Sequence, residues 1–98
     1  MTVDFSSIRN HHEQAVFAAV LAALPRYPGV ASQPALLADV ACVALNRLPP
    51  RYIRHEVDFS FYLTEPERLE IDAAISEAVT YAFNFVTARA ALRARGKS

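Results

Sequence analysis

Apolar residues along the chain fall into three segments with helical character. The first predicted helix runs roughly from Ile8 to Leu24, and Ser6 or Ser7 can cap its first free amides. Its first half is polar, whereas every residue from Ala15 to Leu24 is apolar. A helix that is apolar on all faces has to be surrounded. We therefore expect this helix to lie at the centre of the domain or to be covered by a partner chain.

The second predicted helix runs roughly from Pro34 to Leu48, with Ser32 as its N-cap and the Pro49-Pro50 pair as its stop. Its middle carries only two polar side chains, Asp39 and the weakly polar Cys42, so this helix is also expected to be surrounded. We interpret Cys42 as a small buried apolar residue. Asp39 is interpreted as a structural hydrogen-bonding group, because a buried carboxylate needs a partner; the alternative is an acid or a ligand.

The third predicted helix is the longest and runs roughly from Glu65 to Arg95. It opens with Thr64-Glu65-Pro66-Glu67, which has the pattern of a capping box. Ile71, Ile75 and Val79 belong to an apolar stripe at helical spacing. About 30 residues at a rise of ~1.5 Å give a length of about 45 Å, whereas a compact domain of this size has a radius of gyration of about 13 Å. This helix should therefore protrude, kink or pack against another chain.

The connection from Arg51 to Leu63 contains the strand-like run Phe59 to Leu63. One short run cannot form a sheet, so we expect an extended connection whose aromatic side chains pack on the helices. The sequence thus predicts an all-α fold: one domain over residues 1–98 with three main helices, the last one long, and a short extended connection. Residues 88–98 form an arginine-rich helix end and tail. The first two predicted helices lack a polar face and the third is too long for a compact single chain. Together these features predict a homodimer, in which a second copy covers the apolar surfaces.

Composition and charge narrow the classes of protein. The chain of 98 residues is 53% hydrophobic with a net charge of zero, which excludes a disordered tail and does not favour DNA as a partner. Four charges at the arginine-rich end would bind DNA only weakly and in a salt-sensitive way. The longest uncharged apolar run, Ala15 to Leu24, is too short for the roughly 20 residues of a membrane span. A single cysteine excludes an intrachain disulfide framework and fits a reducing cytoplasm, where we expect the protein to act.

Catalytic and metal-binding motifs are missing from the sequence. His11, His12 and Glu13 are adjacent, so on a helix they point about 100° apart and do not converge on a metal ion. We interpret them as polar residues of an exposed first turn. The sequence has no nucleophile–base pair, no phosphate-binding loop and no paired cysteines. We therefore expect no enzymatic activity, no metal and no cofactor.

The densest group of chemically active side chains follows the second predicted helix. Arginine supplies planar donors for phosphate or a guanine edge, and tyrosine and arginine offer surfaces on which a base can stack. The group therefore suits a nucleotide or phosphodiester. The alternative, which chemistry alone favours, is that the arginines pair with Glu56, Asp58, Glu65, Glu67 or Asp39. The candidate ligand-binding residues are Arg47, Arg51, Tyr52, Arg54 and His55.

Two blocks of the sequence resemble the late competence development protein ComFB family. The stretch from Asn10 to Val16 resembles the family's opening Asn-x-x-Glu-x-x-Val, and the stretch from Asp39 to Tyr52 resembles its block ending in Leu-Asn-x-Leu-Pro-Pro-x-Tyr. The resemblance implies a small all-helical fold and a dimer. Some members bind zinc through a cysteine cluster, but the matching stretch Gly29 to Leu37 has no cysteine, so no zinc is carried over.

The resemblance also implies a function, because some family members are receptors for cyclic di-GMP or cyclic di-AMP. Two hypotheses follow. The first is a non-enzymatic regulator that binds a cyclic dinucleotide at the candidate residues and signals through a protein partner. The second is a structural or adaptor dimerisation module without a small-molecule ligand. The family's signature positions, which we interpret as mostly structural, correspond to Asn10, Glu13, Asp39, Asn46, Pro49 and Pro50.

Overall fold

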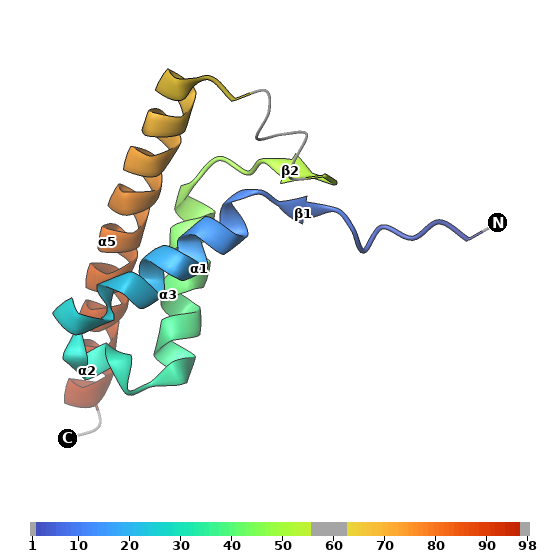
Figure 1. Ribbon diagram of the computed structural model, residues 1–98. Coiled ribbons are helices and arrows are strands. Elements are labelled where there is room, and N and C mark those ends of the chain that lie inside the picture. Colours follow the sequence, from blue (N-terminus) through green and yellow to red (C-terminus); the bar gives the residue numbers. More distant parts are fainter. Residues whose placement is uncertain (1, 56–62, 97–98) are drawn as a thin grey trace.

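The computed structural model describes residues 2–55 and 63–96 of the chain. The all-α prediction is confirmed, with one small two-stranded sheet added (Figure 1). The elements follow one another as β1 (Arg9–Asn10), α1 (His12–Ala23), the 3-10 turn η1 (Leu24–Arg26), α2 (Pro28–Ala31), α3 (Pro34–Arg47), β2 (Tyr52–Ile53) and α5 (Glu65–Gly96).

The first helix begins four residues later than predicted. Helix α1 starts at His12, because Arg9 and Asn10 form a strand that pairs antiparallel with β2. The predicted serine cap is therefore wrong. The Asn10 side chain takes over the role, since its Oδ1 atom accepts a hydrogen bond of 3.2 Å from the His12 amide.

The second helix is confirmed nearly to the residue, since α3 spans Pro34–Arg47. Its predicted cap is wrong: Gln33 precedes the helix in an extended conformation, and its side chain makes no capping hydrogen bond. The one-turn helix α2, which was not predicted, lies just before this point. Tyr27 leads into it and stacks on Phe83 with ring centroids 4.1 Å apart, so this turn is held against α5.

The last helix is a single continuous helix of 32 residues. At its start the Glu67 amide donates to Thr64 Oγ1 at 3.3 Å, and the Thr64 hydroxyl donates to the Glu67 carboxylate at 3.0 Å. Of the three expected outcomes for its length, the single chain shows protrusion: α5 extends beyond the part packed by the other helices (Figure 1). The radius of gyration is 16.1 Å, above the ~13 Å of a compact chain of this size. Both α5 and the extended segment before β1 project from the packed helices (Figure 1).

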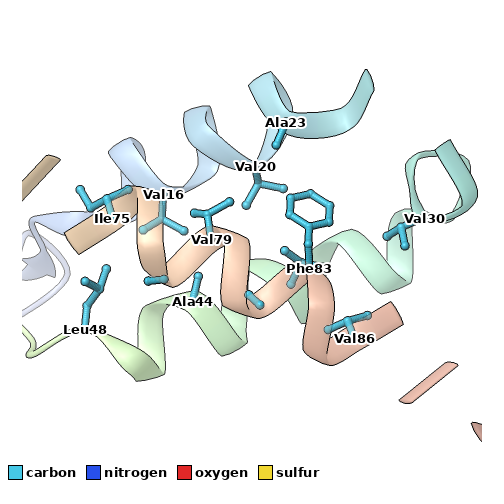
Figure 2. Packing of buried hydrophobic residues seen from close by; sticks show 13 residues of the cluster. Val16, Val20, Ala23, Val30, Ala44, Leu48, Ile75, Val79, Phe83 and Val86 are labelled. Carbon is cyan, nitrogen blue, oxygen red and sulfur yellow. The ribbon is translucent and has the colours of Figure 1, made fainter. Parts of the chain in front are cut away.

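The core lies where α1, α3 and α5 meet (Figure 2). Valine and alanine dominate it, which lets the helices approach closely, and the largest fully buried side chain is Phe83. The buried apolar residues are Val16, Val20, Ala23, Val30, Val40, Ala44, Leu48, Ile75, Ala78, Val79, Ala82, Phe83 and Val86.

Helix α1 is not surrounded within the single chain. Val16 and Val20 face the core, but Phe17 and Leu21 on the other side are 41% and 62% exposed. A central position is therefore wrong for this helix, and a covering partner chain stays a prediction. In the described part of the chain, no helix is long and apolar enough to cross a membrane.

The connection after α3 is extended at Tyr52–Ile53, as expected, but it also forms a strand. The strand at Tyr52–Ile53 was not predicted; it forms because β1 supplies a partner strand from the N-terminal side. The aromatic run that drew attention to this connection, Phe59 to Tyr62, lies outside the described residues.

Candidate functional site

The candidate site is built on the β-ribbon, the antiparallel pair of β1 and β2. Arg9 lies opposite Ile53, and Asn10 lies opposite Tyr52. Beyond the pair, the His11 amide donates to the Arg51 carbonyl oxygen at 2.7 Å. The ribbon thus joins the segment before α1 to the segment after α3.

The Asn10 side chain locks this junction. Its Oδ1 atom accepts one hydrogen bond from the His12 amide at 3.2 Å and a second from the Arg51 amide at 3.1 Å. One carboxamide oxygen therefore satisfies a free amide of the first helical turn and fixes the strand that carries the candidate residues. This is a structural role for a signature position.

The sequence after α3 explains why the chain leaves the helix at this point. The residue before a proline is disfavoured in the helical conformation, and Leu48 has extended dihedrals of −96° and 140°. Leu48 is also buried, which anchors the exit of the helix in the core. Pro49 and Pro50 then direct the following residues along the ribbon.

Four of the five candidate residues lie together on this ribbon segment. Arg51, Tyr52, Arg54 and His55 are all exposed, and Tyr52 is 70% exposed. The sheet adds a residue that the sequence analysis missed, since Arg9 on β1 pairs with Ile53 in the middle of this segment. The overlooked signal was the Tyr-Ile pair after two prolines, which favours a strand and therefore requires a partner strand.

Arg47 instead engages α5. Its Nη2 atom lies 2.8 Å from Glu77 Oε1, and its Nε atom donates to both carboxylate oxygens at 3.2 Å. The guanidinium also lies 3.9 Å from the centroid of the Tyr81 ring. The hydrogen bond from Arg47 lowers the pKa of Glu77. Pairing with an acid was the alternative expectation for this cluster, but the acid is Glu77 on α5.

A hollow of about 510 Å³ lies beside the ribbon, within the ~300–1,000 Å³ typical of small-molecule sites. Its polar lining includes Arg9, Glu13, Asn46 and Tyr52, and apolar side chains such as Leu45 complete it. The Asn46 amide donates to Cys42 Sγ at 3.7 Å, a local bond within α3. Four signature positions line this hollow: Asn10, Glu13, Asn46 and Pro50.

Three burial expectations are wrong. Cys42 and Asp39 were interpreted as buried, but both are exposed, because α1 and α5 cover the part of α3 that carries Val40 and Ala44. His12 was interpreted as exposed, but it is 7% exposed beneath the ribbon, where its Nδ1 atom has no hydrogen-bond partner. Burial lowers the pKa of His12, and the neighbouring His11 lowers it further.

Within residues 2–55 and 63–96, no group of three or more His, Cys, Asp or Glu side chains could hold a metal ion. The family model described as late competence development protein ComFB matches residues 9–90, which is most of the chain. No curated protein and no solved structure gives a significant match. The matched range contains the β-ribbon, the helices that pack in the core and the greater part of α5.

Proposed function

Because the chain belongs to the late competence development protein ComFB family, we propose that it is a non-enzymatic cytoplasmic regulator that binds a cyclic dinucleotide at the β-ribbon. The ligand is cyclic di-GMP or cyclic di-AMP, and the bound protein signals through a protein partner. The observation that carries the proposal is the exposed arginine and tyrosine segment next to the 510 Å³ hollow.

The chemistry of the ribbon matches the two parts of such a ligand. Arg51 and Arg54 supply guanidinium donors for the phosphates, and Arg9 supplies another from the paired strand. The exposed ring of Tyr52 offers a stacking surface for a base. His55 adds a donor at the end of the same segment.

The hollow adds polar side chains that can form hydrogen bonds with the edge of a nucleotide base. Glu13 accepts hydrogen bonds, and Asn46 both donates and accepts them. Both lie on helices that the core holds in place, α1 and α3. Arg47 is left out of the ligand contacts, because its side chain contacts Glu77 and Tyr81 of α5 and does not line the hollow.

Calorimetric titration with cyclic di-GMP and cyclic di-AMP tests this proposal. We expect Arg51→Ala and Arg54→Ala each to weaken binding about tenfold, which is the loss of one charge-assisted hydrogen bond. Arg26→Ala is the matched control, since Arg26 is an exposed arginine in η1 at the other end of α1 (Figure 1). Absence of binding of either nucleotide at millimolar concentration would refute the proposal, as would equal losses in the control.

The second candidate function is an adaptor dimer without a ligand. The exposed apolar side chains of α1, Phe17 and Leu21, favour it, because a second copy would cover them. We propose the homodimer under both functions. A folded dimer that captures a protein partner and binds neither nucleotide would favour the adaptor function.

A further inference from the structure

A second cleft lies between α3 and α5, on a different part of the surface from the β-ribbon. Its volume is about 270 Å³. One wall is formed by Phe85, Arg89 and Arg93, which are spaced four residues apart and therefore share one face of α5. The opposite wall carries Asp39 of α3. Except for Cys42, no residue lines both this cleft and the hollow at the ribbon.

The charges in this cleft are held apart. Among the described residues, no ion pair joins Asp39 to either arginine, and neither guanidinium has another acidic partner. Elsewhere an arginine and an acidic residue of the same two helices do form an ion pair, since Arg47 Nη2 on α3 lies 2.8 Å from Glu77 Oε1 on α5. Two neighbouring guanidiniums without an anion repel each other. The cleft therefore presents a donor pair on one wall and an acceptor on the other, with space between them.

The floor between these walls is apolar. Leu36 and Val43 of α3 are half-buried, Val86 of α5 is buried, and Phe85 presents part of its ring to the cleft. An apolar floor with a few convergent polar groups is the usual form of a small-molecule site. Its volume falls just below the usual ~300–1,000 Å³, so the ligand has to be small.

We propose that this cleft binds a guanine nucleoside monophosphate. The two guanidiniums of Arg89 and Arg93 hold the phosphate, as arginine pairs do through parallel N–H donors. The purine lies on the apolar floor against Phe85. The Asp39 carboxylate accepts the adjacent N1–H and amino donors of guanine, an edge that adenine lacks. This inference goes beyond the cyclic dinucleotide at the ribbon and does not depend on it.

Each wall can be tested separately by calorimetric titration of the full-length protein with GMP, AMP and guanosine. We expect GMP to bind, guanosine to bind at least tenfold more weakly because it lacks the phosphate, and AMP to bind more weakly because it cannot satisfy Asp39. Arg89→Ala and Arg93→Ala should each weaken GMP binding about tenfold. Asp39→Asn should abolish the preference for GMP over AMP.

The replaced side chains are exposed, so the variants are expected to keep the fold, which circular dichroism verifies. Arg26→Ala is again the control and should bind GMP as the wild type does. No GMP binding at millimolar concentration, or unchanged binding in the Arg89→Ala and Arg93→Ala variants, overturns the proposal. Loss of GMP binding in Arg51→Ala would place the nucleotide at the ribbon and also overturn it. Equal affinity for GMP and AMP overturns the assignment of guanine.

Discussion

Replacing Asn10 by alanine tests whether one side chain holds the candidate site in place. In the folded protein Asn10 Oδ1 accepts the His12 amide at 3.2 Å and the Arg51 amide at 3.1 Å. A hydrogen bond contributes about 0.5–1.5 kcal/mol net. The bond to His12 is part-buried and the bond to Arg51 is exposed, so the second amide can turn to water. We therefore expect Asn10→Ala to lower the free energy of unfolding by about 1–2 kcal/mol.

The assay is urea denaturation followed by far-ultraviolet circular dichroism, with Asn10→Asp as the matched control. Aspartate keeps an oxygen at the same position and adds a negative charge near the start of α1, which is favourable there. Asn10→Asp should therefore retain most of the stability. The reasoning is refuted if Asn10→Ala unfolds at the same urea concentration as the wild type, or if aspartate destabilises as much as alanine.

Three further predictions concern other parts of the molecule. Phe83→Ala should lower the free energy of unfolding by about 3–5 kcal/mol in the same urea assay, because the side chain is fully buried and stacked on Tyr27. Burial lowers the pKa of His12 below its usual value of 6.5, so protonation of the imidazole stabilises the unfolded chain relative to the folded protein. The melting temperature should therefore fall as the pH drops below about 6.5, and His12→Gln should reduce this dependence of the melting temperature on pH. Leu21→Glu should convert the expected dimer to a monomer in light scattering without loss of helix, since Leu21 is 62% exposed in the single chain; a dimer that persists contradicts the α1 interface.

The predictable part of the fold is the part set by local rules. The ends of α3 follow from Pro34 in the first turn and from the proline pair after Leu48, and α5 follows from a capping pattern and a sustained apolar stripe. The start of α1 could not be predicted in this way. Asn10 and Tyr52 pair across 42 positions of the chain, and this contact overrides the helical pattern of the first segment.

The candidate site was predictable in composition but not in arrangement. The sequence placed five basic and aromatic residues within nine positions, and four of them do lie along the ribbon. It could not show that Arg47 contacts Glu77, because that contact joins two helices 30 residues apart. It also could not show which side of α3 is covered, since an apolar helix gives no polar face to orient it, and this led to the wrong burial of Asp39 and Cys42.

The shared acceptor at Asn10 has a kinetic consequence. The amides of His12 and Arg51 lie far apart along the chain but hydrogen-bond to the same oxygen atom. When Asn10 swings away, both amides open together, so their exchange with solvent deuterium should be governed by one opening event. The ribbon also closes a loop that includes both α1 and α3. Because closing a long loop costs conformational entropy, we expect the ribbon to form after these helices have docked. We therefore expect the surface that carries Arg51 and Tyr52 to be assembled late in folding and to open early in local unfolding.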